Sequence, residues 1–169
     1  IFGGRFSGPG QNVFRIVPLG QGGSYAATDR LAAGYAMVDA GVTSRLRVVG
    51  GARVERSEVD VVAQPTIGDA VRTAPSYTDV LPSLALNLTL TETQTLRLSG
   101  SQTLSRPEYR ELAPIQFREV IGGDNVLGNA DLRRTLVRNA DVRWEWYPRS
   151  GELLSVALFG KRFQDPIER

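Results

Sequence analysis

The segment from Leu81 to Thr103 alternates aliphatic and polar residues along two arms that flank Glu92 and Thr93. Successive side chains of a β-strand point to opposite faces, so this alternation separates the two kinds of residue. The aliphatic face carries Leu84, Leu86, Leu88, Leu90, Leu96 and Leu98. The other face carries amide, hydroxyl and guanidinium groups at Asn87, Thr89 and Arg97. The segment therefore predicts a β-hairpin with one aliphatic face and one polar face.

A second hairpin is predicted upstream. The stretch LAAGYAMVDA, residues 31–40, is ambiguous, because part of its apolar pattern also has helical spacing. Its neighbour RLRVVGGARVER, residues 45–56, alternates clearly, and only Gly41 to Ser44 separates the two stretches. A connection this short suits a hairpin, so we expect a strand on both sides of it.

Two further alternating segments, 134–147 and 152–163, flank a turn signal at Pro148–Gly151. Together with the two hairpins they predict about six strands of about 10 to 14 residues within 31–163, longer than usual for globular proteins. A glycine-rich N-terminal loop is expected over 1–30. The expected fold class is all-β, an antiparallel up-and-down meander. Short turns are expected near 42–44, 92–94 and 148–151, and longer connections near 62–78 and 104–133.

The turn positions also predict strand registers. Centring the first hairpin on Thr43 places Asp39 opposite Arg47. Centring the second on Thr93 places Leu88 opposite Leu98. A slip of one residue would exchange the two faces of a strand, so the register is a direct test of the assigned faces.

Two environments fit an aliphatic face on long strands. A soluble β-sandwich would bury it between two sheets. An outer-membrane barrel would expose it to lipid and keep its polar face in the lumen, with short turns on the periplasmic side and long loops outside. The strand lengths and the alternation of short and long connections favour the barrel. Trp144 and Trp146 lie beside a short turn, where either an aromatic girdle or an aromatic cap on a sandwich core would place them.

The composition excludes several classes of function. The chain has no cysteine and no histidine, which excludes disulfides, a thiol nucleophile and a serine–histidine–carboxylate triad. Its 20 basic and 18 acidic residues give a net charge of +2 and are interleaved, so we expect no nucleic-acid partner. The chain starts at Ile1 without an initiator methionine or a signal peptide, which suggests a processed or truncated protein.

Several motifs lie on the predicted strands and their connections. YTDVLPS (residues 77–83) leads into the leucine-rich hairpin, and SRPEYRELAP (105–114) follows it. GNADL (128–132) precedes WEWY (144–147). Upstream, the first predicted hairpin adds five residues to this set, which are Tyr35, Asp39, Gly51, Arg53 and Glu55. Over about residues 25–165 this set resembles the barrel of the TonB-dependent outer-membrane receptors.

The resemblance implies a protein of the bacterial outer membrane with about 22 strands around a plug domain. It implies import of a scarce ligand such as an iron–siderophore complex, cobalamin or an oligosaccharide. The implied partners are outer-membrane lipid, the plug domain of the same protein, the TonB energy-coupling complex and the imported small ligand. Six strands are fewer than the minimum of about eight in known barrels. Residues 1–169 are therefore expected to be a barrel fragment without plug domain or terminal strand, with no enzymatic activity and no cofactor.

Candidate site residues fall into two sets. Binding residues concentrate on loops held by a rigid scaffold, so four residues of 104–133 are predicted to contact the ligand. They are Arg106, Tyr109, Arg110 and Arg118. Pro107 suggests a second role, fixing the exit of the chain from its strand. The same segment holds oxygen-rich residues whose spacing favours Asx turns over a calcium site, so no metal is expected. These are Asp124, Asn125, Asn129 and Asp131.

The second set comprises charged residues predicted to face the barrel lumen. They are Asp39, Arg47, Arg53, Glu55, Arg97, Asp141, Arg143 and Glu145. The arginines either contact the plug or an anionic substrate, or pair with carboxylates on the same face. The second alternative is favoured, because unpaired charges are costly even in a partly wet interior.

Overall fold

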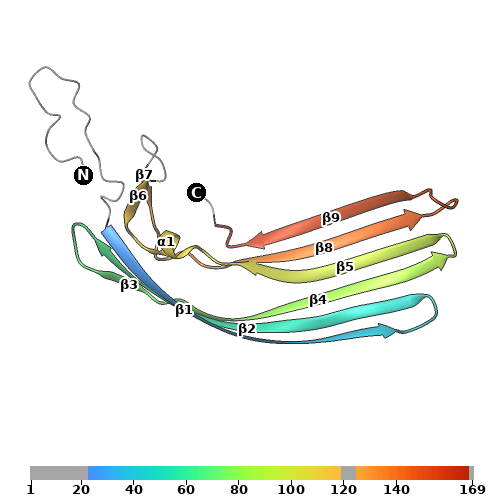
Figure 1. Cartoon of the computed structure of the whole chain (residues 1–169), viewed down its shortest axis with the longest axis horizontal. Helices are drawn as coiled ribbons and strands as arrows, with labels where there is room; N and C mark the ends of the chain where they lie inside the picture. The colour runs from blue at the N-terminus through green and yellow to red at the C-terminus, as the bar shows by residue number, and fades with distance from the viewer. Residues whose placement is uncertain (1–22, 119–124, 168–169) are drawn as a thin grey trace, which may run out of the picture.

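The computed structural model describes residues 23–118 and 125–167, which form one long antiparallel sheet with a small cap at one end (Figure 1). Six long strands follow one another in chain order, which confirms the predicted meander. They are β1 (Gly23–Gly41), β2 (Leu46–Pro65), β4 (Ser76–Thr91), β5 (Gln94–Ser105), β8 (Thr135–Trp146) and β9 (Leu154–Gln164). A short strand, β3 (Val71–Thr73), pairs with the far end of β2. Within the described ranges, no helix is both long enough and apolar enough to cross a membrane.

The three tight turns of the meander, β1–β2, β4–β5 and β8–β9, all lie at one end of the sheet (Figure 1). The longer connections and the cap lie at the other end. This is the predicted arrangement of short and long connections.

The two faces of the sheet separate as predicted. One row of cross-strand partners runs Leu46, Leu88, Leu96, Trp144 and Val156. The next row runs Arg47, Asn87, Arg97, Arg143 and Ala157. Outside a bulge after Thr89, all even-numbered residues of the six strands share one face, here called the apolar face, and odd-numbered residues share the polar face. The apolar face is open to its surroundings: Val38 is 67% exposed and Leu158 is 71% exposed.

Both predicted registers were wrong by two residues. The structure pairs Asp39 with Val49 instead of Arg47, and Leu88 with Leu96 instead of Leu98. A shift by two residues keeps every side chain on its own face, so the face assignments hold.

Turn chemistry accounts for both shifts. In the first turn, the Thr43 hydroxyl oxygen accepts hydrogen bonds from the backbone amides of Arg45 (3.2 Å) and Leu46 (3.0 Å). This ST-type turn centres the hairpin one residue later than expected. The second turn is tight, and a bulge between Thr89 and Thr91 adds an extra residue to one strand.

Strand boundaries also differ from the prediction. β1 begins at Gly23, so residues 23–30 of the expected N-terminal loop are strand; residues 1–22 lie outside the described ranges. β2 continues to Pro65, into the expected 62–78 connection. β1, β2 and β4 have 19, 20 and 16 residues and exceed the expected length. These extensions lie outside the apolar band, which is the part of each strand where aliphatic and polar residues alternate. Alternation therefore does not predict them.

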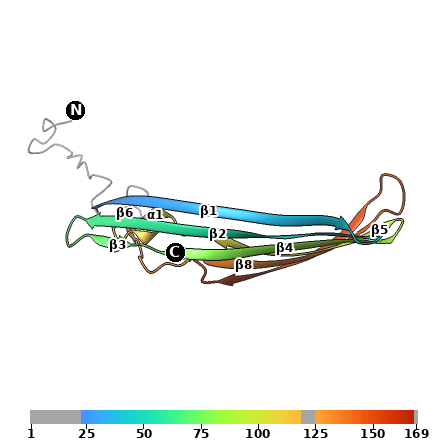
Figure 2. The same cartoon turned by 90° about the horizontal axis from the view of Figure 1, so that it is seen from below.

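The connection between β5 and β8 folds into a cap rather than an open loop. This cap segment (residues 106–134) contains α1 (Tyr109–Leu112) and the two-stranded sheet of β6 (Gln116–Arg118) and β7 (Asn125–Leu127). Its apolar residues join the polar-face end of β2 in the only hydrophobic cluster among the described residues. The cluster consists of Val61, Ala63, Leu112, Ala113 and Ile115. Seen from below, the cap lies beyond β1 and β2, on the far side of the sheet (Figure 2).

Candidate functional site

The cap segment is tied to the sheet at its first residue. Arg106 follows β5 directly and donates from Nη2 to the Glu55 carboxylate of β2 at 2.6 Å. Arg53 donates to the other oxygen of the same carboxylate, also at 2.6 Å. Glu55 is buried, and two guanidinium groups compensate its charge. Pro107 then prevents β5 from continuing, so the predicted role in fixing the chain's exit fits the geometry.

The last residue of the cap segment is tied to the sheet in the same way. Arg134 donates from Nε to a carboxylate oxygen of Asp79 on β4. Its guanidinium carbon also lies 4.3 Å from the centre of the Tyr77 ring, a cation–π contact. The Asp79 side chain is only 3% exposed. A buried carboxylate therefore fixes each end of the cap segment.

Within the cap, close backbone packing depends on Gly128. Its amide donates to the carbonyl of Ile115 at 3.3 Å. A Cβ at this position would lie 2.6 Å from the carbonyl carbon of Ala113, so no side chain fits there. Next to it, the Asn129 side chain accepts a hydrogen bond from the amide of Asp131 at 2.9 Å, the predicted Asx turn. Asp124 lies outside the described residues.

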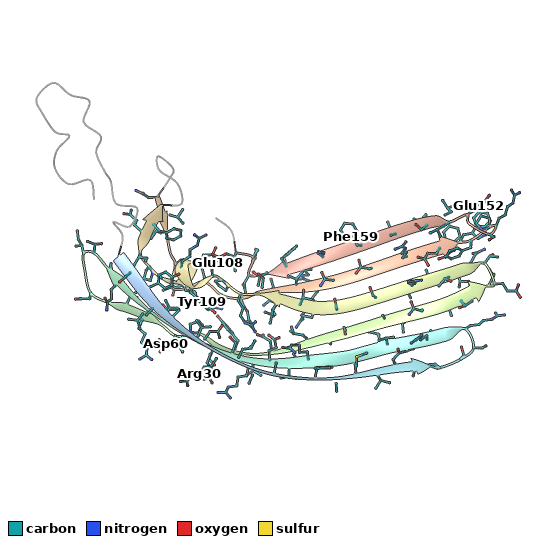
Figure 3. All side chains as sticks on the ribbon, in the orientation of Figure 1. Arg30, Asp60, Glu108, Tyr109, Glu152 and Phe159 are labelled. Atoms are coloured by element: carbon teal, nitrogen blue, oxygen red, sulfur yellow. The ribbon has the colours of Figure 1, made fainter. Side chains whose placement is uncertain are left out.

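A cleft of about 470 Å³ opens between the cap segment and the polar face of β1 and β2. Its chemistry is mixed, with two phenol rings, two carboxylates, two guanidinium groups and an apolar floor. The lining residues are Tyr25, Asp29, Val59, Arg106, Pro107, Glu108, Tyr109 and Arg110. Tyr109 and Glu108 lie on the cap side, above the sheet (Figure 3).

Tyr109 bridges the cleft. Its hydroxyl donates to the Asp29 carboxylate on β1 at 2.9 Å. This hydrogen bond and the negative charge of Asp29 raise the pKa of the Tyr109 phenol above its usual range. Arg110 lies nearby, with its guanidinium 5.2 Å from the Phe117 ring and its Nε 3.0 Å from Glu108. The cleft thus presents two phenols between charged groups of both signs.

Three of the four residues predicted to contact a ligand, Arg106, Tyr109 and Arg110, line this cleft. Arg118 ends β6, and its side chain lies outside the described part of the chain. Sequence reasoning missed Tyr25 and Asp29, because they fall in the expected N-terminal loop. Their spacing of four residues on an alternating strand was the available signal, since it places both on one face.

The eight charged residues predicted to face the lumen all have odd numbers and share the polar face. Their arginines are paired. Arg47 makes a two-pronged contact with Asp39 (2.8 and 2.6 Å), diagonally across the hairpin. Arg97 and Arg143 both contact Glu145, at 3.2 and 3.0 Å. These arginines therefore pair with carboxylates on the same face, which is the alternative that the sequence favoured.

The aromatic pair lies on the opposite face. Trp144 and Trp146 are stacked with ring centres 6.4 Å apart, next to the β8–β9 turn.

In the described ranges, no group of three or more acidic residues is placed to hold a metal ion.

Comparison with known proteins identifies the architecture. Residues 2–169 match the family described as TonB dependent receptor-like, beta-barrel. No curated protein and no solved structure was found to match the chain. The proteins of this family are non-enzymatic transporters of the bacterial outer membrane. The soluble-sandwich alternative is thereby overturned, in agreement with a single large sheet whose apolar face is exposed. The chain belongs to the TonB-dependent receptor-like β-barrel family and forms part of such a barrel.

Proposed function

We propose that the cleft between the cap segment and β1 contacts the imported ligand at the external entrance of the receptor. Outer-membrane barrels have short periplasmic turns and longer external loops, so the end that carries the cap is external. The single observation that carries the proposal is the convergence of Arg106, Tyr109 and Arg110 with Tyr25 and Asp29 around one cleft.

The position of the cap supports a lumen on the polar face. Val61 and Ala63, which pack against the cap, and Glu55 and Asp79, which bind its ends, are all on that face. A cap on the lipid side would have to place its charged residues against hydrocarbon, at a high desolvation cost. The eight charged residues of the polar face then line the lumen. They belong to the part of the barrel wall that faces the plug domain.

The remaining parts of the function follow from membership of the family. Six long strands form one section of the barrel wall, and further strands and a plug domain complete it. Import is driven through the TonB energy-coupling complex, and the ligand is a siderophore complex, cobalamin or an oligosaccharide. The paired phenols and carboxylates of the cleft are hydrogen-bonding groups that suit any of these polar ligands.

The test compares two tyrosines in the complete receptor. Tyr109 is 42% exposed and donates to Asp29, whereas Tyr147 is 41% exposed and donates to Glu145 at the opposite end of the sheet. Tyr109→Ala should lower uptake at limiting ligand roughly tenfold, as expected for loss of an aromatic contact residue. Tyr147→Ala is the matched control and should leave uptake unchanged.

Uptake is measured with labelled ferric siderophores, cobalamin and oligosaccharides in parallel, which also identifies the ligand class. Heat-modifiable gel mobility shows whether each variant is assembled. Normal uptake of every ligand by an assembled Tyr109→Ala receptor would refute a role of this cleft in recognition.

A further inference from the structure

The two arginines that line the cleft are both committed to other parts of the protein. Arg106 donates from Nη2 to the buried Glu55 carboxylate at 2.6 Å. Arg110 donates from Nε to Glu108 at 3.0 Å, and its guanidinium lies 5.2 Å from the centre of the Phe117 ring. A ligand could recruit either arginine only by breaking these contacts. Among the described residues, the cleft therefore holds no unpaired cation.

The one charge of the cleft that lacks a counter-ion in the described part of the chain is negative. Asp29 accepts a hydrogen bond from the Tyr109 hydroxyl at 2.9 Å, but a phenol is neutral and leaves the carboxylate charge in place. The bond engages Oδ2, and Oδ1 has no hydrogen-bond partner among the described residues. An anionic ligand in the cleft would therefore meet an uncompensated negative charge.

Hydrogen-bonding groups of two kinds remain open beside this charge. The Tyr25 hydroxyl has no partner within the described ranges, and it can both donate and accept. The open oxygen of Asp29 can only accept. Tyr25 and Asp29 are four positions apart on β1, so they lie on the same face of the strand and along the same wall of the cleft. A ligand rich in hydroxyl groups can bond to both.

The cleft also offers apolar surface next to these polar groups. Val59 and Pro107 line it, and two phenol rings are partly exposed, Tyr25 of β1 and Tyr109 of the cap segment. A ring of this kind has an apolar body and a polar tip. The C–H face of a sugar ring packs on such a body, while the hydroxyls at its edge reach the polar groups. The arrangement therefore matches both surfaces of a sugar.

We propose that the ligand held by this cleft is an uncharged oligosaccharide. The inference rests on the proposed function of the cleft and narrows its ligand class. A ferric siderophore complex with anionic iron-binding groups needs free cations, which the described cleft lacks. A cationic ligand would lie against the guanidinium groups of Arg106 and Arg110. Sugar hydroxyls need no counter-charge, and they supply the hydrogen bonds that Tyr25 and Asp29 leave open.

The experiment uses the complete receptor in detergent and an array of neutral, acidic and amino-sugar oligosaccharides. Neutral members should bind, and acidic or amino-sugar members of the same linkage should bind about tenfold more weakly. Neutral binding should stay nearly constant between about 0.05 and 0.5 M salt, because salt screens only interactions between charges. A ferric tris-catecholate complex and cobalamin, added as free competitors, should not displace the bound oligosaccharide.

Two variants test the assigned groups. Asp29→Asn replaces a charged acceptor with a neutral one, so binding of the neutral oligosaccharide should fall about tenfold and the preference over acidic members should shrink. Tyr25→Phe keeps the ring and should weaken binding about fivefold. Because the Tyr25 hydroxyl has no partner in the described ranges, this variant removes none of their contacts and remains available if Asp29→Asn does not assemble. Gel mobility shows assembly.

The matched control is Asp131→Asn. Asp131 is an exposed aspartate near the other end of the cap segment and does not line the cleft, so its variant should bind like the unchanged receptor. Neutral binding that falls in both cleft variants, with binding in the control unchanged, supports the proposal.

Acidic or amino-sugar oligosaccharides that bind as tightly as neutral ones would overturn the inference, and so would an array without a neutral binder. Binding of the tris-catecholate or cobalamin that is weakened by Asp29→Asn or Tyr25→Phe would also overturn it, but the cleft would still be a recognition site and the proposed function would stand. If neither these variants nor Tyr109→Ala change the binding of any probe, the proposed function fails together with the inference.

Discussion

Glu55 and Asp79 are direct cross-strand partners on the polar face of β2 and β4, and each binds an arginine from an opposite end of the cap segment. Two buried carboxylates side by side repel each other unless cations compensate their charges. Arg106 and Arg134 remove that repulsion only when the cap is folded over the sheet. Docking of the cap therefore supplies charge compensation to both carboxylates of this pair.

The first prediction concerns this link. Arg106→Gln should loosen the start of the cap segment by about 1–3 kcal/mol, because the buried Glu55 carboxylate loses the one of its two arginine donors that comes from the cap. The sheet itself should stay assembled, since no strand pairing involves Arg106. Limited proteolysis of the complete receptor should then cut within 109–133 faster than in the unchanged protein.

The control for this measurement is Arg97→Gln. Arg97 likewise shares a buried carboxylate, Glu145, with a second arginine, Arg143, but this carboxylate lies far from the cap. Cap cleavage should stay slow in this variant. Equal cleavage rates in the two variants would mean that Arg106 does not hold the cap.

The second prediction concerns Gly128. Gly128→Ala should displace β7 from α1, because the added Cβ cannot coexist with the carbonyl group of Ala113. Hydrogen exchange of the amides of Gly128 and Asn129, which bond Ile115 and Glu111, should accelerate. Gly34→Ala is the control, since a Cβ there meets no atom within 4 Å. Unchanged exchange in Gly128→Ala would contradict the packing described here.

The faces of the sheet could be predicted from the sequence because alternation depends only on residue parity. The registers could not. They depend on the hydroxyl of Thr43 and on a bulge after Thr89, and neither changes the alternating pattern. A two-residue error is therefore the natural failure of such a prediction, because it leaves each face intact.

Part of the candidate site was visible in the sequence. Arg106, Tyr109 and Arg110 lie in a polar connection, which marks them as candidates for binding. Tyr25 and Asp29 belong to a strand end beyond the apolar band, where no hydrophobic rhythm reveals the strand. The fold of the cap was also hidden, because Leu112 and Ile115 become buried only against β2, about 50 residues earlier in the chain.

The third prediction is a pH dependence at the cleft. Asp29 and Tyr109 lie outside the apolar band, which ends at Ala32 on β1. Because the folded-state pKa of Tyr109 is raised, its bond to Asp29 is fully present below the ordinary tyrosine pKa of about 10. The bond is lost only as pH rises through the higher, folded-state value. Tyr109→Phe lacks this phenol, so the difference in tyrosinate absorbance between the unchanged protein and this variant reports Tyr109. The difference should appear only at pH values above the ordinary titration range of tyrosine.

Asp29→Asn tests the cause of that shift, because it removes the negative charge and keeps an oxygen acceptor. The Tyr109 titration should move down towards the ordinary value in this variant. An unchanged titration in Asp29→Asn would show that the negative charge of Asp29 does not raise the pKa of the phenol.

The last prediction tests the two faces themselves. Leu86 lies near the middle of the aliphatic run of β4 and is paired with Leu98 on the apolar face, whereas its neighbour Asn87 is paired with Arg97 on the polar face. Leu86→Arg should lower the free energy of unfolding in lipid by about 2–4 kcal/mol, because it places a charge near the bilayer midplane. Asn87→Ser exchanges one polar group for another in a wet lumen and should cost much less. Reversible unfolding of the complete receptor in lipid vesicles measures both changes. Equal losses of stability would mean that the apolar face does not meet hydrocarbon.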